Sequence, residues 1–312
     1  MIREKYFTFQ SAEGLTDISA KYWIKEGGEP KAVLQIVHGM VEYKERYHAF
    51  ACYMAERDFV VVAHDHLGHG DSVISEEKWG YMTPEQPARV LIEDMQTLRQ
   101  IAETDYPGLP YFMLGHSMGS FMLRMYLAKY GKGLAGAIIM GTGNNPRAAG
   151  LFGVTLCDLL AKVRGWDYRS SFVQSMTYDS SYKKYDVTGK KPQDSWLTKD
   201  QDIVRKYYQD PKCTYVFTLT GYKALFEAVA FDASSKNAAK LPKNLPLLLV
   251  SGAEDPVGQL GKGVKEAAEI YKKAGCWDVS VRLYPGDRHE ILNELDRLQV
   301  YADLERWMGR YL

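Results

Sequence analysis

The chain lacks an apolar run approaching the ~18 residues that a membrane-spanning helix needs. Its first residues, Met1 to Tyr6, are charged and show no apolar segment of the signal-peptide kind. Cysteines are few and widely separated, without any C-x-x-C pair: Cys52, Cys157, Cys213 and Cys276. This pattern favours reduced, mostly buried thiols over a disulfide framework or a zinc site. We therefore expect a cytoplasmic protein.

An excess of charge is also missing. The 39 Lys and Arg residues balance 39 Asp and Glu residues, so nothing favours a nucleic-acid partner. Repeats and low-complexity tracts are absent as well. What is present is an ordinary globular composition, 46% hydrophobic and 25% charged. A length of 312 residues suits one large domain, or a domain with a sizeable insertion.

Strand and helix patterns alternate along most of the chain. The apolar patterns predict strands at Tyr6–Gln10, Ile18–Ile24, Val33–Val37, Phe59–Ala63, Tyr111–Leu114, Gly136–Met140, Leu247–Val250 and Val279–Tyr284. They predict helices at Tyr47–Arg57, Ile92–Thr104, Phe121–Ala128 and Lys262–Ala274, with a closing helix that runs to Leu312. Repeated strand–helix units imply a mostly parallel, doubly wound α/β sheet, whose active loops lie at the carboxyl ends of the strands.

The alternation stops between about residues 144 and 243. Apolar residues there recur at helical spacing, most clearly in Leu151–Val163, and tyrosines gather near Tyr178 and Tyr182. We therefore predict a helical insertion at 144–243, late in the sheet. The core then consists of a first part, 1–143, and a second part, 244–312.

A nucleophile motif, G-x-S-x-G, stands at Gly115-His116-Ser117-Met118-Gly119. An apolar strand precedes it and a helix without Gly or Pro follows, which is the setting that a strained strand-to-helix turn requires. The small residues keep side chains away from the tight turn. This context favours a catalytic Ser117 over a chance glycine turn.

A serine hydroxyl needs a base to remove its proton and an acid to orient that base. In the expected chain order the acid precedes the histidine. Asp255 follows the strand Leu247–Val250, with Glu254 as an adjacent competitor, and we favour Asp255. His289 follows the strand Val279–Tyr284 and is the only histidine after the nucleophile motif, so we predict that it is the base.

Two backbone N–H groups are needed to hold the oxyanion. The residue after the serine, Met118, supplies one. The loop after Val33–Val37 reads His38-Gly39-Met40, and we expect the N–H of Met40 to supply the other.

The segment His64-Asp65-His66-Leu67-Gly68-His69-Gly70-Asp71-Ser72 resembles the D-H-x-G-H-G-x-S signature of the monoacylglycerol lipase and lysophospholipase group of α/β-hydrolases, of the serine aminopeptidase S33 type. The resemblance continues at residues 105–110, in the nucleophile motif, and at residues 251–255 and 285–289, and it leaves out the insertion. It implies an α/β-hydrolase fold, with Ser117, Asp255 and His289 as the catalytic triad and Met40 and Met118 as the oxyanion donors.

The resemblance also implies hydrolysis of monoacylglycerols, lysophospholipids or other medium-to-long acyl esters through an acyl-enzyme, with no cofactor and no metal. One difference lies in the oxyanion loop. The family often has H-G-x-G-E-H there, whereas Val41 and Tyr43 replace a glycine and a histidine in this chain. We expect that difference to affect the shape of the acyl pocket.

Three histidines in the signature segment, His64, His66 and His69, have a spacing that could ligate a metal. The family resemblance instead explains the segment as a structural loop in which Asp65 and Ser72 bond the backbone. We favour the structural loop.

In this family the insertion is a cap that shapes the substrate tunnel, and its apolar face often meets lipid. Leu151–Val163 is therefore a candidate for peripheral membrane contact, although the same residues could simply pack on the core.

Two rival functions remain open. The scaffold could cleave amides or thioesters, and as an aminopeptidase it would need carboxylates such as Glu227 or Asp232 to bind a free amino terminus. It could also be a small-molecule receptor that binds its ligand without appreciable turnover.

Overall fold

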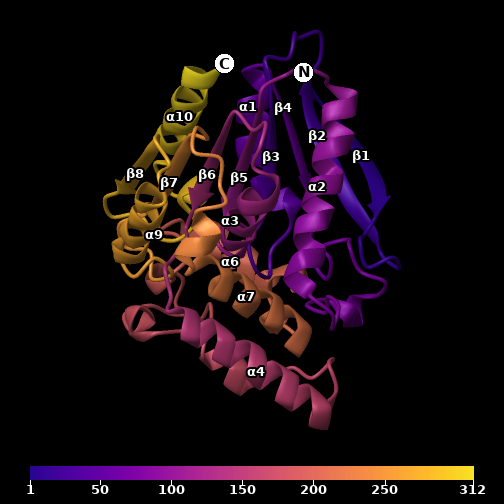
Figure 1. Cartoon of the computed structure of the whole chain (residues 1–312), viewed down its shortest axis with the longest axis vertical. Coiled ribbons are helices and arrows are strands. Elements are labelled where there is room, and N and C mark those ends of the chain that lie inside the picture. Colours follow the sequence, from indigo (N-terminus) through magenta and orange to yellow (C-terminus); the bar gives the residue numbers. More distant parts are fainter.

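Eight strands form one sheet in the computed structural model, which describes all 312 residues (Figure 1). The strand order is β1-β2-β4-β3-β5-β6-β7-β8. The strands are β1 (Ile2–Gln10), β2 (Asp17–Lys25), β3 (Ala32–Val37), β4 (Phe59–His64), β5 (Tyr111–His116), β6 (Gly136–Met140), β7 (Leu247–Gly252) and β8 (Val279–Tyr284). The pairs β1–β2 and β2–β4 are antiparallel and all the others are parallel. This confirms the predicted mostly parallel sheet.

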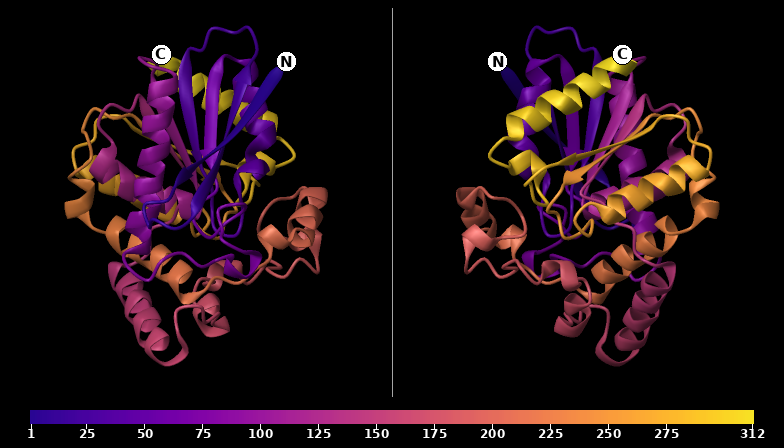
Figure 2. Two further views of the ribbon diagram at one scale, coloured as in Figure 1. Left: turned by 90° about the vertical axis from the view of Figure 1, so that its right-hand side faces the viewer. Right: turned by 90° about the vertical axis from the view of Figure 1, so that its left-hand side faces the viewer.

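Helices cover both faces of the sheet (Figure 2). On one side lie α1 (His48–Glu56) and α10 (Arg297–Met308), and on the other α2 (Pro87–Asp105), α3 (Met118–Tyr130) and α9 (Lys262–Lys273). Successive strand residues point to opposite faces, so in β4 Val60 and Val62 join one core while Val61 and Ala63 join the other. A strand buried on both sides has to be apolar throughout, which explains the Val-rich sequence of β4.

Element boundaries differ from the predicted ones by a few residues. The helix predicted from Ile92 begins at Pro87, since proline is well tolerated in the first turn, where an amide hydrogen would have no acceptor. The first strand begins at Ile2 instead of Tyr6. The closing helix ends at Met308, and a short 3₁₀ turn follows it.

Between β6 and β7 the chain forms helices and no named strand. These helices are α4 (Arg147–Arg164), α5 (Ser171–Ser175), α6 (Gln201–Gln209), α7 (Leu219–Asp232) and α8 (Ser235–Ala238). In Figure 1 α4 lies farthest from the sheet, with α7 between the two. The domain boundaries at residues 144 and 243 stay a prediction.

None of the helices combines the length and apolar character that crossing a lipid bilayer requires. The carboxyl ends of β3, β5, β6 and β7 meet at one edge of the sheet because these strands run parallel. Of the helices between β6 and β7, α4 and α7 lie beyond this edge (Figure 1).

Candidate active site

Ser117 lies in the sharp turn between β5 and α3, with φ 53° and ψ −122°. A positive φ is strained for a residue with a side chain, so surrounding contacts have to hold it. The Ser117 N–H donates to the carbonyl oxygen of Met140 over 3.0 Å. Close packing also holds the turn in place. Gly119 lies so near β3 that a side chain there would collide with the carbonyl oxygen of Val37.

His289 and Asp255 lie in direct contact. His289 Nδ1 is 2.9 Å from Asp255 Oδ1, and both residues are buried. Asp255 also accepts hydrogen bonds from Ser251 Oγ at 2.7 Å and from the Val257 N–H at 2.9 Å. Burial opposes ionisation, but His289 and these donors outweigh it and lower the Asp255 pKa. An ionised Asp255 assigns the proton to His289 Nδ1 and leaves Nε2 free to accept one.

The competing acid, Glu254, lies elsewhere. Its carboxylate pairs with Lys184 at 3.2 Å, in a partly exposed position. Of the two adjacent carboxylates, only Asp255 contacts the imidazole.

The imidazole of His289 is held between two rings. Trp196 stacks on it with centroids 4.9 Å apart, and His116 lies 4.7 Å away on a tilted plane. The His289 backbone N–H donates to the carbonyl oxygen of Trp196 over 3.3 Å. Trp196 was not predicted as a site residue, and it belongs to the segment in which the sequence pattern was weakest.

Ser117 opens into two cavities that share Met40, Tyr178 and Trp196. The larger has a volume of about 400 Å³ and also contains His289. Its walls are aromatic and charged: Glu42, Arg46, Tyr178, Trp196, Tyr207, Tyr208, Tyr215, Tyr222 and Glu290. The smaller has a volume of about 200 Å³ and contains Met118 but not His289. Its walls are mainly apolar, with Phe121, Ala149, Met176, Leu225, Phe226 and Val229.

A buried charge network borders the larger cavity. Arg46 forms a bidentate pair with Glu290, at 2.6 and 2.8 Å, and contacts Glu42 at 3.0 Å. His116 Nδ1 lies 3.1 Å from Glu42, and its Nε2 lies 3.3 Å from the His289 carbonyl oxygen. Burial disfavours a charged His116, but Glu42 outweighs it and raises the His116 pKa.

Sequence reasoning missed this network. The spacing of Glu42 and Arg46, four residues apart, and the position of Glu290 directly after His289 were the available signals.

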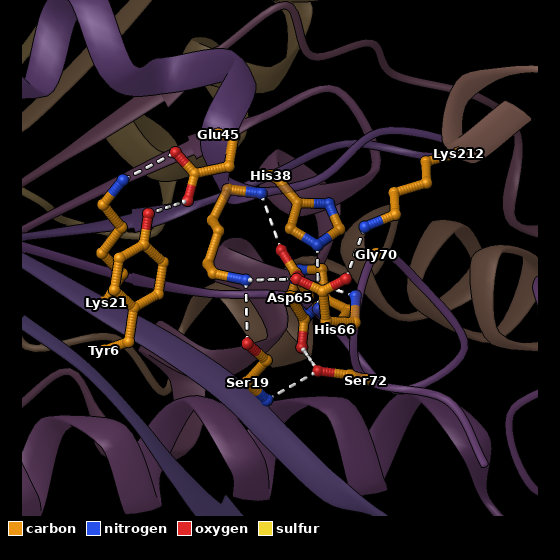
Figure 3. Close-up of polar contacts among 12 residues, drawn as sticks. Tyr6, Ser19, Lys21, His38, Glu45, Asp65, His66, Gly70, Ser72 and Lys212 are labelled. Carbon is orange, nitrogen blue, oxygen red and sulfur yellow. Dashed lines mark hydrogen bonds and ion pairs between the residues drawn. The ribbon is translucent and has the colours of Figure 1, made fainter. Parts of the chain in front are cut away.

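The oxyanion loop is held by the side chain of His38. The His66 N–H donates to His38 Nε2 over 2.8 Å (Figure 3). The proton of His38 is therefore on Nδ1, which donates to the Gly39 carbonyl oxygen over 2.8 Å. That carbonyl and the N–H of Met40 belong to one planar peptide group. His38 therefore fixes the direction in which the Met40 N–H points. Burial, with His69 nearby, keeps the His38 pKa well below its usual range.

The two substitutions in this loop have different consequences. Val41 adopts φ 56°, a left-handed conformation that favours glycine and is strained for a β-branched side chain. Tyr43 donates to Asp210 over 2.7 Å and does not line either cavity, whereas Val41 lines the larger one. Of the two, only Val41 contributes to a cavity wall.

The signature segment is a structural loop, as interpreted from the sequence. Asp65 accepts hydrogen bonds from the backbone N–H groups of Lys44 and Asp71, at 2.8 and 2.9 Å. Ser72 Oγ donates to the Asp65 carbonyl oxygen over 2.7 Å and accepts from the Ser19 N–H over 2.9 Å (Figure 3). A buried ion pair between Lys44 and Asp65, at 2.7 Å, completes it.

The three histidines of this segment are buried with their rings close together. Burial lowers the pKa of each, that of His69 to about 4. No group of three His, Cys, Asp or Glu side chains in the molecule is arranged to hold a metal ion.

The carboxylates suggested for an amino-terminal substrate lie outside both cavities. Glu227 accepts from the Ala88 N–H over 3.2 Å at the start of α2. Asp232 is buried and lies 3.3 Å from Arg124. Neither lines a cavity at Ser117, so that part of the aminopeptidase hypothesis is wrong.

The chain is similar to one family model and to several known proteins. The family model described as "Serine aminopeptidase, S33" matches residues 28–296. The human monoglyceride lipase is 28% identical over 295 residues, which cover 93% of this chain and 86% of the lipase. A monoacylglycerol lipase from Mycolicibacterium smegmatis is 26% identical, over 91% of this chain and 90% of its own. A thermostable carboxyl esterase from Bacillus coagulans, solved with glycerol, has a TM-score of 0.89 and 30% identity, over 100% of this chain and 99% of its own.

Proposed function

The chain belongs to the serine aminopeptidase S33 family of α/β-hydrolases and is a carboxylic ester hydrolase like the monoacylglycerol lipases, and from this premise we propose that Ser117, His289 and Asp255 hydrolyse monoacylglycerol-type esters. The observation that carries the proposal is the contact of His289 with Asp255, together with the cavity that His289 and Ser117 both line. The substrate is a small acyl ester or lipid.

In the proposed cycle, His289 Nε2 accepts the proton of Ser117 Oγ, which attacks the ester carbonyl carbon. The N–H groups of Met40 and Met118 stabilise the oxyanion. Met118 is the first residue of α3, so its N–H has no acceptor within the helix. When the intermediate collapses, His289 protonates the departing alcohol, and Asp255 stabilises the imidazolium.

Deacylation repeats these steps with water. His289 removes a proton from the water, whose oxygen attacks the acyl-enzyme carbonyl, and Ser117 Oγ recovers its proton as the acid leaves. Apart from the water, each step uses side chains and backbone groups alone, so the proposed cycle needs no cofactor.

The two cavities suit the two halves of the ester. The departing alcohol has to lie beside the imidazole that protonates it, and His289 lines only the larger, polar cavity. The acyl chain then occupies the smaller, apolar cavity beside the oxyanion donors Met40 and Met118. This division favours a polar alcohol such as glycerol over an apolar one.

We also propose that the cap contacts lipid surfaces. Four large apolar side chains on α4 are strongly exposed, Leu151, Phe152, Leu159 and Val163, and Phe172 on α5 is exposed as well. An amphipathic helix with such a face can insert into the interface of a bilayer.

The four cysteines are free thiols, which supports the proposed cytoplasmic location. Fractionation of cells that carry the tagged protein would test that location.

A substrate panel tests the proposed function. Initial rates on glycerol monoesters and p-nitrophenyl esters should exceed those on the matched thioesters and aminoacyl-naphthylamides. Faster cleavage of the naphthylamides would identify an aminopeptidase. Turnover far below ~1 s⁻¹ on every substrate, together with tight ligand binding, would identify a receptor.

A further inference from the structure

This inference rests on the proposed function, in which the smaller cavity at Ser117 holds the acyl chain. That cavity is short for a lipid chain. Its volume is about 200 Å³. Met118 and Phe121 of α3 form the wall next to Ser117, and Leu225, Phe226 and Val229 of α7 form another wall. The depth of the pocket therefore depends on how α7 is placed.

Phe226 is held against α4 by a notch in that helix. The notch exists because Gly153 has no side chain: a Cβ there would collide with the Phe226 ring. Gly150, one turn earlier, also allows close approach, since a Cβ there would lie 2.8 Å from the Phe226 carbonyl oxygen. Only 8% of Phe226 is exposed. The ring thus forms a fixed part of the cavity wall, next to Ala149 and Gly150 of α4.

Volume limits the chain that this pocket accepts. A water-sized group occupies about 30 Å³, and a methylene is of similar size, so about 200 Å³ holds roughly six or seven carbons beyond the carbonyl carbon. We propose that the enzyme selects acyl chains of about eight carbons or fewer, and that Phe226 sets this limit. Longer chains have to expose methylenes to water or displace the ring.

The prediction concerns kcat/KM across a series of glycerol monoesters with acyl chains of 2 to 16 carbons, each below its critical micelle concentration. The value should rise about fourfold per methylene up to about eight carbons, as each is buried, and then level off or fall. A maximum at 14 to 16 carbons would overturn the inference and leave ester hydrolysis standing. Hydrolysis at no chain length would overturn the proposed function and the inference together.

Two substitutions should move the limit in opposite directions. Gly153→Ala pushes the Phe226 ring into the cavity and should shorten the preferred chain by about two carbons. Phe226→Leu vacates part of the wall and should lengthen it by a similar amount. Thr155→Ala, at an exposed position of the same helix, is the matched control and should keep the wild-type profile. If both variants keep that profile, Phe226 does not set the limit.

Discussion

His38 shows how one buried side chain can position a catalytic group without touching substrate. Its Nε2 accepts from the His66 N–H, so its Nδ1–H is committed to the Gly39 carbonyl oxygen. Because that oxygen and the Met40 N–H share one rigid peptide plane, the imidazole of His38 fixes the direction of the Met40 N–H, the proposed oxyanion donor. The strained φ of Val41 makes such a restraint necessary.

Replacement of His38 by alanine should therefore impair the transition state more than substrate binding. Loss of one oxyanion donor lowers kcat by about 10²- to 10³-fold in related chemistry, and we expect a fall of this order with little change in KM. The measurement is a Michaelis–Menten analysis on a soluble ester, with the fold checked by circular dichroism. His48→Ala, at a partly exposed position on α1, is the control. A well-folded His38→Ala enzyme with wild-type kcat would show that the oxyanion loop does not need His38 to orient it.

Residue types and their order along the chain were enough to select the candidate triad, because each member follows an apolar strand. The charge network of Glu42, Arg46 and Glu290 could not be predicted in this way. Arg46 and Glu290 are 244 residues apart, and their contact depends on how the sheet brings two loops together. Trp196, which stacks on His289, likewise depends on the folding of a long irregular segment.

Among the secondary-structure elements, strands buried on both faces were predicted to within two residues at each end. Their apolar runs are short, and most are bounded by polar residues, glycine or proline. Helix ends were less exact, as at Pro87, because apolar periodicity begins only where a helix first meets the core. The individual helices α6 and α7 were not predicted. In α7 the reason is that the helix is apolar on nearly every side and so lacks a clear helical period.

The exposed apolar face of α4 is expected to bind lipid surfaces. Changing Phe152 and Leu159 together to serine removes two large apolar side chains and should weaken binding to phosphatidylcholine vesicles by about tenfold or more. Vesicle sedimentation measures the binding. Hydrolysis of a short soluble ester should not change, because neither residue lines a cavity at Ser117.

A matched control is available on the surface of the α/β part of the molecule, away from α4. Leu295 and Leu298 are each 67% exposed, and their double change to serine should leave vesicle binding intact. Equal losses in both double variants would mean that α4 is not the docking face.

For the molecule as a whole, the decisive feature is the edge at which parallel strands end. The loops after β5, β7 and β8 carry Ser117, Asp255 and His289. Because these strands run parallel, the three loops lie at the same edge of the sheet. The helices inserted between β6 and β7 then enclose the two cavities at Ser117. The core supplies the chemical groups, and α7 with the segment around Trp196 supplies much of the walls.

The turnover of Ser117→Ala on a glycerol monoester tests the central claim most directly. If Ser117 is the nucleophile and acts as a unit with His289 and Asp255, kcat should fall by about 10⁶-fold while the folded structure is retained. Hydrolysis by a well-folded Ser117→Ala protein at close to the wild-type rate would contradict the account.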